Sequence, residues 1–161
     1  MNIFYRSERV GKHGKLFSML KFRTLKENGR TSYSHGDNYT KFGRFMRKYR
    51  IDEIPQIWHV FTRRMNLVGP RPLEKRTLDL YPLEIQVKLL SIRPGLFGLS
   101  GLYFMDEEKL LSFSDYPEKD YWGKIVPMKI ALDFFYIDNK CFSLDMWIVW
   151  QCIKKGLIWR N

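Results

Sequence analysis

Two adjacent carboxylates are the residues of this sequence that could most directly do chemistry. Asp52 and Glu53 lie in the stretch YRIDEIPQIWHVF, just after Arg50 and just before Pro55. An Asp at a helix start most often accepts a backbone N–H as an N-cap, and a Glu in the first turn favours the helix dipole. A helix start can also bind a phosphoryl group, with one carboxylate as nucleophile and the other handling a proton. Neighbouring helical residues do not share a face, so two different roles are expected.

Two short basic motifs could supply cations for a phosphate next to these carboxylates. Arg71 stands between Pro70 and Pro72 in VGPRP, where each proline restricts the backbone. A planar fork held on such a segment suits phosphate, although a proline turn with an incidental arginine is the alternative. Lys21 and Arg23 of KFRT are two residues apart and would share one face of a strand. Two cations on one face suit a diphosphate, whereas a solvated strand edge is the plainer interpretation.

A basic amphipathic helix is predicted over residues 40–50, TKFGRFMRKYR. Its apolar residues recur at helical spacing and form one face, which could either pack on the core or lie on anionic headgroups; they are Phe42, Phe45, Met46 and Tyr49. Arg47 of this helix and Arg93 of the later R-P-G segment are further candidates for binding phosphate.

The positive charge of the chain is concentrated near its start. The net charge is +11, and residues 1–50 contain 13 Lys and Arg against 3 Asp and Glu. The remaining 111 residues are nearly neutral, with 15 against 14. Such asymmetry indicates an anionic partner: a phosphorylated ligand, an anionic membrane surface or nucleic acid. A nucleic-acid-binding domain is the weakest of these hypotheses, because the sequence contains no recognised nucleic-acid motif.

The sequence predicts a mainly helical α+β fold in one domain over residues 1–161, and the elements of this fold must position the candidate residues. Two short strands around a turn at residues 11–14 form a small N-terminal β-hairpin. A polar loop is expected over 26–38 and an irregular glycine-rich segment over 93–103. The expected helices share apolar periodicity; they cover 52–65, 74–92 with a break near Pro82, part of 106–124, and 126–159 with a break at IDNK.

The C-terminal helix carries more tryptophan than one core requires. Its sequence is SLDMWIVWQCIKKGLIW. Core packing is expected for most of its apolar residues, and an interfacial role is the alternative. In that role the aromatic and basic side chains would lie near lipid headgroups; they are Trp147, Trp150 and Trp159 with Lys154, Lys155 and Arg160.

These motifs in this order resemble the bacterial sugar transferases, also called monotopic phosphoglycosyl transferases. The matching segments are RVGKHGKLFSMLKFRTL, KFGRFMRKYRIDEIPQIWHVF, MNLVGPRP, IRPGLFGL and LDFFYIDNKCFSLD. The resemblance extends from about Ile3 to about Cys152. Each segment is a weak signal alone, whereas D-E-x-P-Q followed by V-G-P-R-P and R-P-G is a specific combination.

The resemblance implies an enzyme of polysaccharide biosynthesis. Such enzymes move a sugar 1-phosphate from a nucleotide-diphosphate sugar, such as a UDP-sugar, to a polyprenyl phosphate, such as undecaprenyl phosphate. They act at the cytoplasmic face of the bacterial inner membrane, as peripheral or monotopic proteins. By this likeness Asp52 is the nucleophile that forms a covalent phosphosugar intermediate, with Mg2+ bound nearby, and Glu53 assists. Arg71 would hold phosphate, and Lys21 and Arg23 would lie near the diphosphate.

The sequence departs from the family pattern in four places, one of which is RRMN, where the family has G-D-M-S before V-G-P-R-P. Family members usually carry a membrane-embedded hydrophobic helix before the segment that matches IFYRSERVG, and this sequence starts at that segment. The family's R-P-G-[IL]-T-G reads RPGLFG, with Phe97 at the usual threonine, and the following glycine-rich element reads SGLYFMD. The alternative hypothesis is therefore a catalytically impaired fragment or an accessory membrane-surface module of the same fold.

Overall fold

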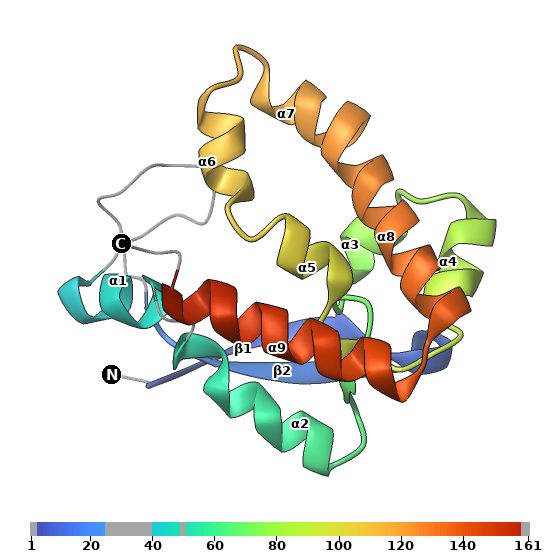
Figure 1. The fold of residues 1–161 in the computed structure, drawn as a ribbon, viewed down its shortest axis with the longest axis horizontal. Helices are drawn as coiled ribbons and strands as arrows, with labels where there is room; N and C mark the ends of the chain where they lie inside the picture. The colour runs from blue at the N-terminus through green and yellow to red at the C-terminus, as the bar shows by residue number, and fades with distance from the viewer. Residues whose placement is uncertain (1–2, 25–39, 49–50, 159–161) are drawn as a thin grey trace.

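The computed structural model describes residues 3–24, 40–48 and 51–158 (Figure 1). The polar loop expected over 26–38 lies outside these residues, as do Trp159 and Arg160 of the predicted interfacial set. Within the described part, the architecture is mainly helical with a small antiparallel hairpin, as the sequence predicts.

The N-terminal hairpin pairs β1 (Phe4–Val10) with β2 (Leu16–Phe22). The connection between them contains a short 3-10 turn, η1 (Lys12–Gly14), in which His13 and Gly14 have positive φ angles of 57° and 76°. Such angles reverse the chain within a few residues and are easily adopted by glycine. The predicted strands around residues 11–14 are therefore confirmed.

Helix α1 (Lys41–Lys48) is joined to the end of β2 through its first turn. The Thr40 hydroxyl accepts the Gly43 N–H at 2.8 Å, which caps the helix. A Cβ on Gly43 would lie 2.2 Å from the Thr24 carbonyl oxygen, so only glycine allows this approach. The predicted apolar face divides: Met46 is buried, whereas Phe42 and Phe45 are 70% and 52% exposed.

The segment with the two carboxylates begins as a 3-10 helix, η2 (Ile51–Gln56), and continues as α2 (Ile57–Phe61). The expectation of one helix starting at an Asp52 N-cap is therefore wrong, because Asp52 lies inside the 3-10 turn. Pro55 supplies the reason: it has no N–H to donate and its ring crowds the preceding turn, which disfavours regular α-helix there.

A second, parallel pair of strands was not expected from the sequence. It joins β3 (Asn66–Val68) to β4 (Gly95–Phe97), which falls in the segment expected to be irregular. Between them the chain forms α3 (Lys75–Leu78) and α4 (Leu83–Leu89), which confirms the predicted break near Pro82.

After β4 the rest of the described chain is helical, and its last helix packs against the parallel pair (Figure 1). Tyr136 of α8 and Ile148 of α9 are almost completely buried, and they form a core cluster with Val68 and Leu99. No helix in the described ranges combines the length and apolar character needed to cross a bilayer. The elements of this part are α5 (Leu99–Tyr103), α6 (Glu107–Ser112), α7 (Pro117–Asp120), η3 (Tyr121–Ile125), α8 (Val126–Asn139) and α9 (Phe142–Ile158).

Candidate active site

Glu53 is held between two of the predicted cations. The Lys21 ammonium donates to Glu53 Oε1 at 3.3 Å, and the Arg71 guanidinium donates to the same oxygen at 3.2 Å. The side chains of Glu53 and Lys21 are only 15% and 20% exposed, whereas that of Arg71 is 49% exposed. Three segments far apart in sequence, β2, η2 and the loop after β3, therefore meet at one carboxylate next to Asp52.

The charges of this cluster influence one another. Burial and the nearby Arg71 guanidinium lower the pKa of Lys21, although Glu53 opposes the shift. The carboxylate of Glu53 raises the pKa of Arg71, with smaller contributions from Glu107 and Asp52. An anion is thus stabilised where Lys21 and Arg71 converge, which is the property that a phosphate site requires.

Backbone hydrogen bonds between the V-G-P-R-P and R-P-G segments fix the position of Arg71. The Gly95 N–H donates to the Pro70 carbonyl at 2.8 Å, and the Gly69 N–H donates to the Phe97 carbonyl at 2.9 Å. A Cβ on Gly95 would lie 2.0 Å from the Gly69 nitrogen. The two glycines therefore let the backbones touch, and the prolines then direct Arg71 toward η2.

His59 holds β2 in register with the carboxylate segment, a role that sequence reasoning missed. Its side chain is 1% exposed and its Nε2 accepts the Leu20 N–H at 3.2 Å, next to Lys21. Burial and the Arg64 charge lower its pKa, which favours the neutral imidazole that such an acceptor needs. The signal available was a histidine inside the apolar run IWHVF.

Arg9 is a further cation of this region that was not predicted. Its guanidinium lies 2.9 Å from Glu74, and its side chain is 20% exposed. Burial lowers the pKa of Arg9; Glu74 opposes this shift, and Arg71 adds to it. The coupling to Arg71 indicates that Arg9 belongs to the same group of charges. The motif ERVG contains this arginine, but the sequence shows no partner for it.

Of the three other predicted phosphate ligands, two have side chains that the structure describes, and neither of these pairs with the acidic residues there. Among the described residues, Arg23 forms no ion pair with Asp52 or Glu53, and its buried Nε has no hydrogen-bond partner there. Arg93 is exposed, and within the described part it forms no ion pair with either carboxylate. The backbone of Arg47 lies in α1, but its side chain is outside what the structure describes.

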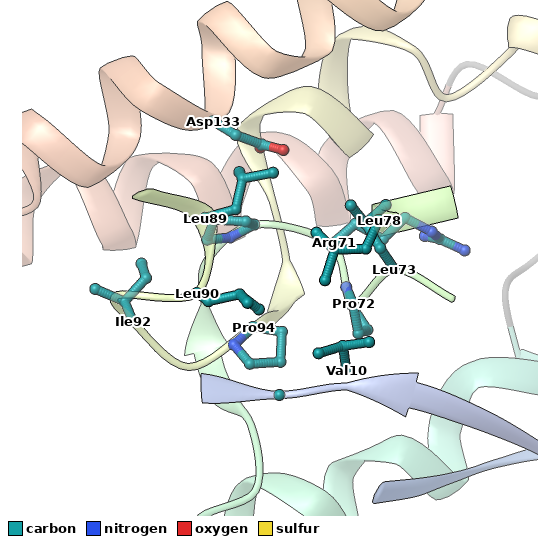
Figure 2. Close-up of a pocket in the computed structure, with 12 residues that line it drawn as sticks. Val10, Arg71, Pro72, Leu73, Leu78, Leu89, Leu90, Ile92, Pro94 and Asp133 are labelled. Carbon is teal, nitrogen blue, oxygen red and sulfur yellow. The ribbon is translucent and has the colours of Figure 1, made fainter. Parts of the chain in front are cut away.

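Behind the Arg71 segment lies a small, mostly apolar cavity (Figure 2). Figure 2 shows Val10 and Pro94 on one side of it and Asp133 of α8 on the other. Its volume of about 20 Å3 is room for one water molecule, so it cannot hold a sugar nucleotide. Burial raises the pKa of Asp133 to about 6, against the opposing effects of Ser100 and Lys129. Arg71 lines this cavity and is also the ion-pair partner of Glu53.

The acidic pair could hold a divalent cation only together with a ligand from outside the protein. Within the described ranges, no three His, Cys, Asp or Glu side chains come together as a metal site. Mg2+ is commonly held by one or two carboxylates plus substrate phosphates and waters. Asp52 and Glu53 fit that pattern, since their neighbours Lys21 and Arg71 also favour phosphate.

Comparison with known proteins gives a consistent result. The family model described as bacterial sugar transferase matches residues 1–158. The uncharacterized sugar transferase EpsL of Bacillus subtilis is 34% identical over 162 residues, which cover 97% of this chain and 70% of EpsL. The exopolysaccharide production protein ExoY of Sinorhizobium fredii is 30% identical, over 96% of this chain and 72% of ExoY.

A longer relative has a name that specifies a reaction. It is the UDP-N-acetylgalactosamine-undecaprenyl-phosphate N-acetylgalactosaminephosphotransferase of Aeromonas hydrophila. The identity is 30% over 165 residues, which cover 94% of this chain but 34% of that protein. The similarity to the present chain therefore lies in about a third of the longer enzyme.

Proposed function

The chain belongs to the bacterial sugar transferase family, and from that premise we propose that it transfers a sugar 1-phosphate from a nucleotide-diphosphate sugar to a polyprenyl phosphate. The named relative from Aeromonas hydrophila, which acts on undecaprenyl phosphate, supports this substrate class. The observation that carries the proposal is the convergence of Lys21 and Arg71 on Glu53, directly beside Asp52.

In this proposal Asp52 is the nucleophile. One of its carboxylate oxygens forms a bond to the phosphorus that bears the sugar, and the bond from that phosphorus to the bridging oxygen breaks. The nucleoside monophosphate leaves with the bonding electrons. An oxygen of the polyprenyl phosphate then attacks the same phosphorus, which releases Asp52 and yields a polyprenyl diphosphate sugar. Both steps bring negative groups together, so nearby cations lower the barrier.

Glu53 has a different role from Asp52 in this proposal. Because its Oε1 accepts hydrogen bonds from both Lys21 and Arg71, Glu53 holds these cations at the edge of the site. Lys21 and Arg71 then bind the phosphate oxygens, and Arg71 is half exposed and accessible to substrate. Mg2+, held by Asp52 and the donor phosphates, would neutralise part of the diphosphate charge.

We also propose that the protein binds an anionic membrane surface peripherally, at the cytoplasmic face of the bacterial inner membrane. Large apolar side chains are exposed on α1 and α2, including Phe42, Trp58 and Phe61. Trp147 and Trp150 are 44% and 62% exposed on α9. Aromatic side chains and cations together favour a lipid headgroup region. Lys155 of the predicted headgroup set instead donates to the Leu102 carbonyl at 2.9 Å.

The test is a transfer assay with labelled nucleotide-diphosphate sugars, detergent-solubilised polyprenyl phosphate and Mg2+. The wild type should turn over and, without acceptor, should retain label covalently while releasing nucleoside monophosphate. Asp52→Asn should lose turnover by roughly four orders of magnitude. Asp79→Asn is the matched control, since it removes an exposed carboxylate that is paired with Lys75.

Two outcomes would contradict the proposal. Turnover surviving in Asp52→Asn would rule out that residue as the nucleophile. A wild type that binds vesicles but transfers none of the tested donor sugars would favour the accessory membrane-surface module.

A further inference from the structure

We propose that Arg9 is a third phosphate-binding residue of this site, and that Glu74 occupies its guanidinium until an anionic substrate replaces the carboxylate. This inference rests on the proposed function, because it requires a substrate with a diphosphate or phosphate group. It assigns a substrate-binding role to the Arg9–Glu74 ion pair, whose other possible role is to stabilise the fold.

The hairpin register places Arg9 on the same face as Lys21. In the antiparallel pair, Arg9 is opposite Phe17 and Tyr5 is opposite Lys21. Opposite residues share a face, and so do residues two apart in one strand. Phe17 is buried on that face, so the face is the inner one. Arg9 and Lys21 are therefore inward-facing cations about 13 Å apart along the hairpin.

A backbone hydrogen bond ties Arg9 to the segment that carries Arg71. The Val10 N–H donates to the Leu73 carbonyl at 2.9 Å, which joins the end of β1 to the chain just after the P-R-P turn. Glu74, the next residue, then pairs with Arg9 at 2.9 Å. The position of Arg9 is thus set by backbone contacts and persists if its carboxylate partner moves.

The charges of the group leave a place for a substrate anion. Nearby carboxylates neutralise the charge of three cations, Lys21, Arg71 and Arg9. A diphosphate therefore binds favourably only if one carboxylate breaks its ion pair and leaves a cation for the phosphate. Two carboxylates pair with these three cations in the described part of the chain: Glu74 is 39% exposed and Glu53 is 15% exposed. Glu74 is therefore the one that can turn toward solvent.

Glu74 also has a second cationic partner outside the group. Arg76 lies 3.5 Å from its other oxygen, and the Arg76 side chain is 92% exposed. The carboxylate can therefore leave Arg9 without losing all cationic contacts. A guanidinium fork binds phosphate with the same geometry as carboxylate, so the exchange requires no rebuilding of the site.

The experiment measures the binding of inorganic pyrophosphate and of UDP by titration calorimetry at fixed ionic strength, without added lipid. Arg9→Gln should weaken binding about tenfold, because one charged hydrogen-bond donor is lost. Glu74→Gln should tighten binding about threefold, because the competing anion is removed. Lys124→Gln is the matched control: it removes an exposed cation that is paired with Asp120, outside this group of charges, and binding should stay within about twofold.

The opposite signs for Arg9 and Glu74 separate this role from a structural one. A structural ion pair would make Arg9→Gln and Glu74→Gln weaken binding together, and that result would overturn the inference. If Arg9→Gln does not fold, Arg9→Lys tests whether the two-pronged guanidinium is needed, and it should weaken binding severalfold. Glu74→Gln must still bind more tightly than the wild type. A wild type that binds neither pyrophosphate nor UDP also overturns it.

Failure of the inference and failure of the proposed function give different results. Tight pyrophosphate binding with the predicted signs, but no sugar transfer, would support the phosphate site and contradict the transferase proposal. Sugar transfer by Arg9→Gln with an unchanged KM for the donor would contradict the inference and leave the transferase proposal intact.

Discussion

Two neighbouring regions of this protein are held together in different ways. The parallel strands β3 and β4 meet through backbone atoms, at Gly69 and Gly95, where there is no room for a side chain. The charge cluster beside them is held by side chains, with Glu53 between Lys21 and Arg71. The two regions therefore have different roles. The backbone crossing fixes the position of Arg71, and the ion pairs hold charged side chains whose pairing a bound substrate can change. Variants of the first region should unfold the protein, and variants of the second should mainly change activity.

The largest effect on stability is expected from Gly95→Ala. The new Cβ would lie 2.0 Å from the Gly69 nitrogen and 2.6 Å from its Cα, so the two segments must separate. The free energy of unfolding should fall by about 3 kcal/mol or more, as measured by urea titration. Gly101→Ala is the control, because its Cβ has nothing within 4 Å; within α5 it should be neutral or gain about 1 kcal/mol.

A second prediction concerns the buried carboxyl of α8 that lines the small cavity. Burial raises the pKa of Asp133 from 3.8 to about 6, so the folded protein holds this proton more tightly than the unfolded chain. Stability should therefore fall as the pH rises from about 4 through about 6, by about 2 kcal/mol between pH 4.5 and 7.5. Asp133→Asn has no such proton, and the difference in unfolding free energy between wild type and variant should shrink or reverse with rising pH. A difference independent of pH would contradict the assigned pKa.

A smaller loss is expected at the junction of β3 with the last two helices. The Tyr136 hydroxyl is 2.7 Å from Asp145 Oδ1 and 3.0 Å from the Val68 carbonyl, in a side chain that is 1% exposed. Tyr136→Phe leaves these acceptors with one hydrogen bond fewer and should cost about 1–2 kcal/mol in thermal or urea unfolding. Tyr103→Phe, at a 58% exposed position, should change stability by less than about 0.5 kcal/mol. Equal effects of the two variants would show that the buried hydroxyl contributes nothing.

The smallest change in stability, with a large change in activity, is expected for Glu53→Gln. The amide keeps the shape but weakens both ion pairs, which should cost about 1 kcal/mol because the cluster is partly solvated. Turnover should fall at least about a hundredfold, because Lys21 and Arg71 lose the charge that positions them. Glu84→Gln removes an exposed acid from the first turn of α4 and should leave turnover unchanged. A Glu53→Gln variant that unfolds like Gly95→Ala would remove the proposed distinction between the regions.

The hairpin, the mainly helical character and the break near Pro82 could be predicted because they depend on local patterns. Alternation, helical spacing and proline act within a few residues, and the structure has all three features. The helix start at Asp52 was misjudged because the capping preference of Asp was weighed more heavily than the effect of Pro55. The parallel pair was missed because each strand has only three residues, and each is stable only against the other.

The candidate site was predicted in part. The sequence identified Lys21, Glu53 and Arg71, and the structure brings these three together. It also suggested Arg23 and Arg93, which do not join the acidic pair in the described residues. Side-chain type and spacing make each of these cations an equally good candidate for binding phosphate. The direction in which each side chain points depends on contacts with residues that are distant in sequence. Arg9 and His59 were missed for the same reason.

The sequence by itself determined the chemical groups, the local elements and the family, since these follow from residue types at short separations. The sequence alone shows the two carboxylates in D-E-x-P-Q, the arginine between two prolines and the basic strand. Only the tertiary structure decided which cations share an anion. That choice depends on the crossing of Gly69 and Gly95 and on the hydrogen bond from Val10 to Leu73. These contacts join segments that are brought together by packing, and no local pattern encodes them.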